Sequence, residues 1–113
     1  MEKQGFAVSE VNQYLKQLLE SQSDLHHIPV LGEISNFKRY QSGHCYFTLK
    51  DEKSALKCVM FKSSAAHLSF HPQNGEKVVA LGSISVYERD GVYQLYVNAM
   101  RRQGVGDLSM HDF

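Results

Sequence analysis

SGHCYFTLKD, residues 42–51, is a stretch in which apolar and polar side chains alternate. Successive side chains of a β-strand point to opposite faces, so the alternation predicts a strand with one core face and one exposed face. The two phases are Cys45, Phe47 and Leu49 on one side and His44, Tyr46, Thr48 and Lys50 on the other. The second phase carries an imidazole, a phenol and an ammonium side by side, which mere solvent exposure does not require.

A second strand follows after the polar turn Asp51–Ser54. Residues 55–62, ALKCVMFK, alternate in the same way, and closing the turn pairs Lys50 with Ala55. In this register the exposed face pairs His44 with Phe61, Tyr46 with Val59, and Thr48 with Lys57. The predicted core face holds Cys45, Phe47, Leu49, Leu56, Cys58 and Met60.

The rest of the chain predicts one helix followed by a five-stranded fold. Apolar side chains at 11, 14, 15, 18 and 19 indicate an amphipathic helix over 8–21, with Ser9 as its N-cap and its apolar stripe covering one end or side of the sheet. Strands are expected over 28–38, 44–50, 55–62, 77–87 and 92–100, with a bulge or bend at Gly32, an interruption at Gly82, and a hairpin turn over 88–91.

Residues 63–76 have room for one or two helical turns before Pro72 and Gly75 break the helix. A short helix between the third and fourth of five strands is typical of the OB-fold, a Greek-key barrel. The predicted fold class is therefore mainly β, an OB-fold barrel preceded by an amino-terminal α-helix.

Composition limits the functional classes. The chain has 113 residues, of which 42% are hydrophobic and 21% charged, as expected for one globular domain. It has no apolar run of membrane-spanning length, and MEKQGF lacks the pattern of a secretory signal. Its two cysteines lie outside any CxxC motif, so we expect reduced thiols in the cytoplasm. Twelve basic and twelve acidic residues cancel, so an argument for nucleic-acid binding must rest on where the charges lie.

Aromatic and basic residues recur together on the predicted exposed face. Bases of single strands stack on aromatic rings while cations follow the phosphates, and OB-folds bind ligands on this hairpin and the flanking loops. The candidate nucleic-acid-binding residues are Phe37, Lys38, Arg39, Tyr40, His44, Tyr46, Lys50, Lys57, Phe61, Lys62, Tyr87, Arg89 and Tyr93.

Structural explanations compete with this interpretation. A Tyr46–Val59 pair stabilises any antiparallel sheet, and Phe61 could instead pack under the amino-terminal helix. No nucleophile has an evident base partner, and no metal or cofactor site is predicted. The sequence favours binding over catalysis.

Three segments carry a resemblance to a known family: VSEVNQYLKQLLE, GEISNFKRYQSGHCYFTLKDEKSALKCVMFK and GSISVYERDGVYQL. From about Val8 to Leu108 the chain resembles the amino-terminal region of the exonuclease VII large subunit. The resemblance implies a bacterial cytoplasmic exodeoxyribonuclease, an enzyme of DNA degradation and repair that cuts single-stranded DNA to oligonucleotides. It carries a binding role over to Phe37, Lys38, Arg39, His44, Tyr46, Phe61 and Lys62. Pro29 replaces an expected aromatic residue, and the chain has no Trp, so stacking on the first strand stays open.

The resemblance also implies a domain division. Residues 1–27 would form the helix and a connection, 28–101 the OB-fold, and 102–113 the start of a linker to an absent catalytic domain. The expected partners are single-stranded DNA and, outside this region, the small subunit of exonuclease VII; a homodimer is a further expectation. The alternatives left open are a structural or subunit-interaction module and an RNA-binding domain of the anticodon-binding type.

Overall fold

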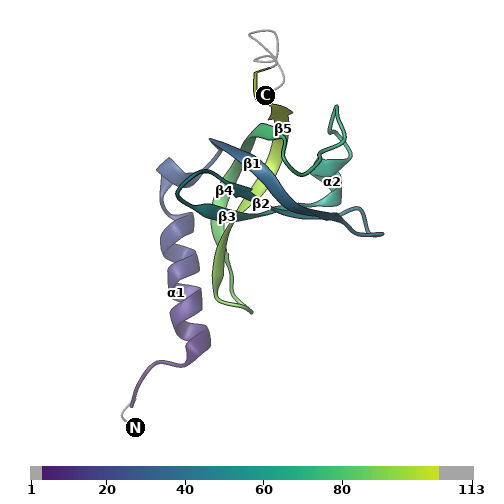
Figure 1. Cartoon of the computed structure of the whole chain (residues 1–113). Helices are drawn as coiled ribbons and strands as arrows, with labels where there is room; N and C mark the ends of the chain where they lie inside the picture. Colours follow the sequence, from purple (N-terminus) through teal and green to yellow (C-terminus); the bar gives the residue numbers. More distant parts are fainter. Residues whose placement is uncertain (1–3, 105–113) are drawn as a thin grey trace.

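Five strands close into a barrel in the order β1-β2-β3-β5-β4 (Figure 1). β3 and β5 run parallel, and every other neighbouring pair is antiparallel. The computed structural model describes residues 4–104. Its elements are α1 (Val8–Glu20), the 3-10 turn η1 (Ser23–Leu25), β1 (Ile28–Arg39), β2 (Cys45–Lys50), β3 (Ala55–Met60), α2 (Lys62–Ala65), β4 (Lys77–Tyr87) and β5 (Val92–Arg102). The predicted OB-fold, with its short helix between β3 and β4, is confirmed.

The β2–β3 hairpin has the predicted register. Lys50 pairs with Ala55, Thr48 with Lys57 and Tyr46 with Val59. Asp51 closes the turn, because its Oδ1 accepts hydrogen bonds of 2.8 Å from the backbone N–H groups of both Lys53 and Ser54. The ladder ends one pair earlier than expected, at Cys45 and Met60, so His44 and Phe61 lie just beyond it.

The barrel interior is filled by the predicted core phase and by matching phases of the other strands. Cys45, Phe47 and Leu49 are buried, as are Cys58 and Met60, while Leu56 is partly buried against the core. Both cysteines are free thiols. The other strands and α2 contribute Ile34, Ala65, Val78, Ala80, Ile84, Leu95, Val97 and Met100.

One of the two predicted strand irregularities is confirmed. The β4–β5 register shifts between Leu81 and Gly82, and a Cβ atom at Gly82 would lie 2.3 Å from the carbonyl oxygen of Tyr96. No bulge occurs at Gly32, because the β1–β4 register runs unbroken from Ile28 to Glu33, the residue from which β1 also pairs with β2. The bulge of β1 occurs against β2 between Ser35 and Lys38, where Asn36 adopts a φ of 53°.

Helix α1 packs on the barrel through polar side chains. Asn12, Lys16 and Glu20 share one helical face, and each contacts β4 or the turn after it. The Asn12 amide donates to the Glu88 carbonyl (3.1 Å), Lys16 Nζ lies 3.4 Å from Glu88 Oε1, and the Ser85 hydroxyl donates to Glu20 Oε2 (2.6 Å). Figure 1 shows α1 beside the β4–β5 hairpin.

Two expectations for α1 are therefore wrong. The apolar stripe does not cover the barrel: only Leu19 packs against the core, while Val11, Tyr14, Leu15 and Leu18 are exposed. Ser9 lies inside the helix, and the N-cap is Ala7, whose backbone N–H donates to Glu10 Oε1 at 2.8 Å. Within residues 4–104, no helix has both the length and the apolarity needed to cross a membrane.

Candidate nucleic-acid interface

Five aromatic rings, here called the aromatic face, gather on and beside the outer side of β2, β3 and β5. Val59 pairs with Tyr46 across β2 and β3 and with Tyr96 across β3 and β5, so these two tyrosines flank Val59. Val59 itself is buried, although alternation predicts it on the exposed face. The members of the face are Tyr40, His44, Tyr46, Phe61 and Tyr96.

Tyr40 and Tyr46 form one edge-on ring pair of the aromatic face. Their centroids lie 5.3 Å apart at an interplanar angle of 77°, and with Ser42 they line a shallow hollow in the surface. The turn between them is closed by two hydrogen bonds, from Tyr40 N–H to the His44 carbonyl (3.0 Å) and from Gly43 N–H to the Tyr40 carbonyl (2.9 Å). Tyr46 is 40% exposed, so one side of its ring is open to a ligand.

Phe61 lies between two other rings. The imidazole of His44 meets it edge-on at 5.4 Å, and the Tyr96 ring lies 5.9 Å away, inclined by 33°. Such pairs add to the energy of burial and restrict ring motion. The Phe61 side chain is nevertheless 47% exposed.

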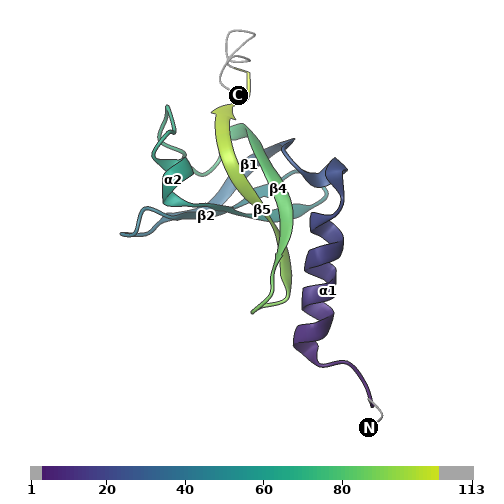
Figure 2. The same ribbon diagram turned by 180° about the vertical axis from the view of Figure 1, so that it is seen from behind.

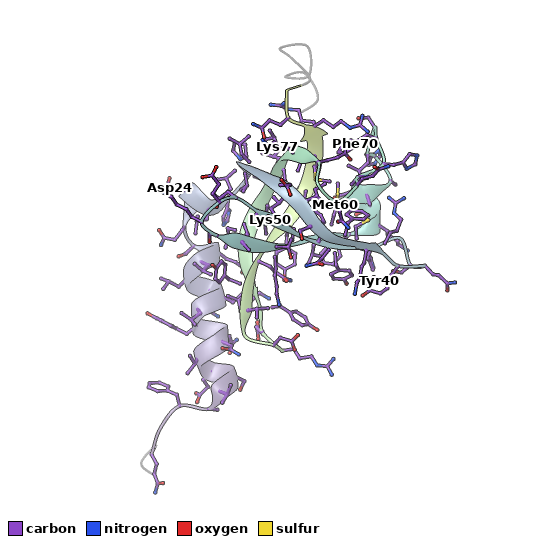
Figure 3. The ribbon with its side chains drawn as sticks, viewed as in Figure 1. Asp24, Tyr40, Lys50, Met60, Phe70 and Lys77 are labelled. Atoms are coloured by element: carbon purple, nitrogen blue, oxygen red, sulfur yellow. The ribbon has the colours of Figure 1, made fainter. Side chains whose placement is uncertain are left out.

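The alternative position for Phe61, under the amino-terminal helix, is not the one observed. Phe61 directly precedes α2, and Figure 2 shows α2 and α1 on opposite sides of the barrel. Figure 3 likewise shows Tyr40, another member of the face, far from Asp24 in η1, the turn that follows α1. The Phe61 ring is thus available on the surface, and α1 packs against β4 instead.

His44 connects the aromatic face to α2. Its Nδ1 accepts a 2.9 Å hydrogen bond from the backbone N–H of Lys62, the first residue of α2. A neutral imidazole that accepts at Nδ1 carries its proton on Nε2. The side chain of His44 is therefore oriented by two contacts, one to a ring and one to the backbone.

Three lysines surround the aromatic face without a carboxylate partner. Lys38 pairs with Tyr46 across β1 and β2, Lys57 pairs with Thr48, and Lys62 begins α2. All three are exposed, and within residues 4–104 none of them forms an ion pair. Although the chain has no net charge, these uncompensated cations make the region of the rings locally positive.

Other residues of the predicted site lie apart from the aromatic face. The Phe37 ring packs 5.7 Å from Phe47 and belongs to the edge of the core. Arg39 pairs with Cys45, on the core-facing phase, and its Nε donates to Cys45 Sγ at 3.4 Å. Lys50 forms an ion pair with Glu33, its Nζ lying 3.8 Å from Glu33 Oε2.

The β4–β5 hairpin residues are also separate. Tyr93 lines an apolar cleft with Lys50, Leu31 and Leu56, away from the ring cluster. Tyr87 lies at the end of β4, and Arg89 is exposed in the turn that follows. The structure therefore brings together Tyr40, His44, Tyr46 and Phe61 with the three lysines, and leaves the hairpin residues outside this group.

Tyr96 is the residue of the face that sequence reasoning missed. It lies on the phase of β5 opposite to buried Leu95 and Val97, and its hydroxyl accepts a 2.9 Å hydrogen bond from the Gln94 amide. The alternation of YQLYVNA would have assigned Tyr96 to the outer phase. It could not have revealed that β5 lies parallel to β3 with Tyr96 beside Val59.

The side chains that the aromatic face presents are rings and lysines. Within residues 4–104, no group of three or more His, Cys, Asp or Glu side chains is placed to hold a metal ion. Burial raises the pKa of the Cys58 thiol to about 12, which keeps it protonated and unreactive. Hydrogen bonds from Lys53 and Ser54 lower the pKa of Asp51 in its turn.

The barrel that carries the aromatic face is the fold of a family of nucleic-acid-binding domains. The chain belongs to the family described as OB-fold nucleic acid binding domain, whose pattern matches residues 6–101. Along its sequence it matches the amino-terminal part of exodeoxyribonuclease 7 large subunits. It is 53% identical to the subunit from Ruminiclostridium cellulolyticum, over 91% of this chain and 26% of the relative. It is 55% identical to that from Clostridium botulinum, over 89% and 25%.

Solved structures with the same fold are more distant. A replication protein A heterotrimer bound to ssDNA superposes with a TM-score of 0.58 at 13% identity, covering 77% of this chain and 65% of the other. Asparaginyl-tRNA synthetase from Pyrococcus horikoshii gives a TM-score of 0.51 at 17% identity, covering 74% and 21%. At such identities the likeness concerns the fold. The chain spans about a quarter of the length of the curated relatives that it matches.

Proposed function

We propose that this domain binds single-stranded DNA on the aromatic face and, within a longer exodeoxyribonuclease VII large subunit, captures substrate for a nuclease domain. The observation that carries the proposal is the exposed ring cluster with unpaired lysines around it. Rings stack on any base, and cations follow the phosphates, so the expected binding depends little on sequence. The cytoplasmic location, the hydrolysis of DNA and contacts with a small subunit are proposals for the whole protein.

A titration of a fluorescently labelled oligothymidylate against the domain, followed by anisotropy at two salt concentrations, tests the proposal. Binding should weaken as salt rises, with a log–log slope of about −2 to −4 if roughly three to five phosphates are contacted. Binding that does not depend on salt, or no binding at low salt, would contradict capture by this face.

RNA is the competing ligand. The tRNA synthetase neighbour shares the fold, and single-stranded RNA offers the same bases and phosphates. The aromatic face as described contains rings and lysines, which do not distinguish a ribose from a deoxyribose. Competition between DNA and RNA oligonucleotides of one sequence decides the question: a preference for RNA would replace the DNA assignment with an RNA-binding one.

A second candidate function, pairing with another copy of this chain, is favoured by α1. Val11, Tyr14, Leu15 and Leu18 form an exposed apolar stripe, and all lie within the residues matched by the family pattern. Monomers seldom leave such a continuous patch open. Two identical stripes can cover each other around a twofold axis without any complementary charge.

Light scattering with and without the oligonucleotide separates the two functions. A stable dimer that Leu15→Lys converts to a monomer, while Gln13→Lys on the same helix does not, would support assembly. A monomer that binds the oligonucleotide supports capture alone. A dimer that also binds DNA supports both functions, because α1 lies on the other side of the barrel from α2, which Phe61 directly precedes.

A further inference from the structure

We infer that His44 is a positioning residue that holds the aromatic face in place only as a neutral imidazole, so that protonation of His44 weakens the binding of single strands. The inference deepens the proposed function and rests on it. His44 acts through its neighbours: Phe61 presents the ring and Lys62 the cation, while His44 contacts both.

The hydrogen bond to Lys62 requires the uncharged form of His44. Nδ1 accepts the Lys62 backbone N–H at 2.9 Å. An imidazolium carries a proton on both nitrogens and cannot accept. Protonation would therefore place the Nδ1–H of His44 opposite the backbone N–H of Lys62, so that two donors face each other without an acceptor. Lys62 directly follows Phe61, whose ring His44 contacts.

Little room exists to relieve that conflict. Gly43, which precedes His44, has a φ of 95°, and a Cβ atom built there would lie 3.0 Å from the Cβ of Lys62. The turn thus meets the start of α2 at two consecutive residues. A shift of the imidazole away from Lys62 must move this turn, the start of α2, or the Phe61 ring.

The charged side chains on the segments around His44 are cations. The elements packed around His44 carry Lys38 and Arg39 at the end of β1, Lys57 on β3 and Lys62 on α2, all cations, together with the phenols of Tyr40, Tyr46 and Tyr96. Within residues 4–104, no carboxylate forms an ion pair with His44. A proton on His44 would gain no counter-ion and would lose the bond to Lys62.

The opposite role makes the opposite prediction. If His44 instead contacted a phosphate directly, its protonation would add a favourable charge and strengthen binding in acid. The sign of the pH effect specific to His44 therefore distinguishes a positioning residue from a direct ligand.

The experiment compares the wild type with His44→Asn and His44→Leu in binding an oligothymidylate at about pH 8 and about pH 5.5, a range in which imidazoles change charge and thymine does not. Asparagine Oδ1 can accept the Lys62 N–H and does not titrate, while leucine cannot accept it. At about pH 8 we expect both variants to bind more weakly than the wild type, because both lose the ring contact with Phe61. His44→Leu should bind about two- to tenfold more weakly than His44→Asn, because only asparagine keeps an acceptor for the Lys62 N–H. In acid the wild type should weaken relative to His44→Asn, because only the wild type can lose its acceptor for the Lys62 N–H by protonation.

Two results would overturn the inference: wild-type binding that strengthens in acid relative to His44→Asn, or equal binding by all three proteins at about pH 8. The Lys62 amide resonance in the NMR spectrum of the free domain provides a readout that does not need DNA. A shift with pH in the wild type that is absent in His44→Asn supports the positioning role, and an unchanged resonance contradicts it. If no protein binds DNA while the Lys62 amide titrates, the proposed function fails and the positioning of α2 by His44 stands.

Discussion

The ring of Tyr96 on β5 lies 5.9 Å from the ring of Phe61, which follows β3, with an angle of 33° between their planes. The two rings meet because β3 and β5 run parallel with Val59 beside Tyr96. This ring pair joins the predicted hairpin surface to a strand far along the chain. The aromatic face is therefore a product of barrel closure as well as of the β2–β3 hairpin.

Tyr96→Ala is expected to weaken the binding of single-stranded DNA, because it removes one side of the support for the Phe61 ring. The expected loss is about 1 kcal/mol, the size of an aromatic pair interaction. Tyr96→Phe keeps the ring and loses only the hydroxyl that accepts from Gln94, so it should bind nearly as the wild type does. Anisotropy titrations compare them; equal losses in both variants would assign the effect to the hydroxyl.

Tyr46→Ala and Phe61→Ala should each weaken binding by about 1–3 kcal/mol, the usual value of one base stacked on one ring. Both side chains are substantially exposed, so neither change should unfold the barrel. Tyr93→Ala is the matched control: Tyr93 is 60% exposed but lines a separate apolar cleft. Folding is checked by circular dichroism, and a loss for Tyr93→Ala as large as for Tyr46→Ala would move the site to the β4–β5 hairpin.

Lys38→Ala and Lys57→Ala should each make the salt dependence of binding less steep, by about 0.7 in the log–log slope for every phosphate that is no longer neutralised. The reason is that fewer counter-ions are released when a cation is missing. Lys77→Ala serves as control, because Figure 3 shows Lys77 well away from Tyr40. Salt titrations of the three variants test this, and an unchanged slope for both Lys38→Ala and Lys57→Ala would exclude these two lysines as phosphate ligands.

Gly82→Ala is expected to destabilise the barrel by about 2 kcal/mol or more, or to prevent folding. The new Cβ atom would lie 2.3 Å from the Tyr96 carbonyl oxygen, and backbone on both strands would have to move. Gly5→Ala, with nothing within 4 Å of its Cβ position, should change the free energy of unfolding very little. Urea denaturation followed by circular dichroism measures both variants; a stable Gly82→Ala protein would contradict the close strand approach.

The folded state is expected to lose stability in acid because of Asp51. Hydrogen bonds from Lys53 and Ser54 lower its pKa below the ordinary value of 3.8. A carboxyl group whose pKa is lower in the folded state stabilises that state fully above its unfolded pKa, and this contribution is lost as the pH falls through the folded pKa. Below about pH 4 the wild type should therefore lose stability relative to Asp51→Asn, whose amide oxygen can still accept both bonds. Urea midpoints across this range test it, and parallel curves would show that Asp51 does not contribute.

The local sequence pattern was sufficient for the hairpin and the fold class. Alternation assigned Cys45, Phe47 and Leu49 to the core, and the length of the turn from Asp51 to Ser54 set the register, because both depend on neighbouring residues. A glycine inside a predicted strand was enough to predict the irregularity at Gly82. The order of strands and the short helix were enough to predict the barrel.

Tertiary structure decided which of the predicted aromatic residues belong to the aromatic face, and it added Tyr96 to them. Phe37 and Tyr46 look alike in sequence, yet Phe37 packs against Phe47 because the β1 bulge at Asn36 changes which side chains point outward. Tyr96 joined the face through a parallel strand pair that no local pattern encodes.

The position of α1 also depended on the assembled barrel. Its apolar stripe correctly predicted a helix, but the stripe does not determine what the helix packs against. β4 and the turn after it provide hydrogen-bond and ion-pair partners for Asn12, Lys16 and Glu20. The polar face of α1 therefore packs on the barrel, and most of its apolar face is exposed. Periodicity determines which residues share a face, because it follows from local backbone geometry. What each face packs against is decided by distant residues, which come together only when the barrel closes.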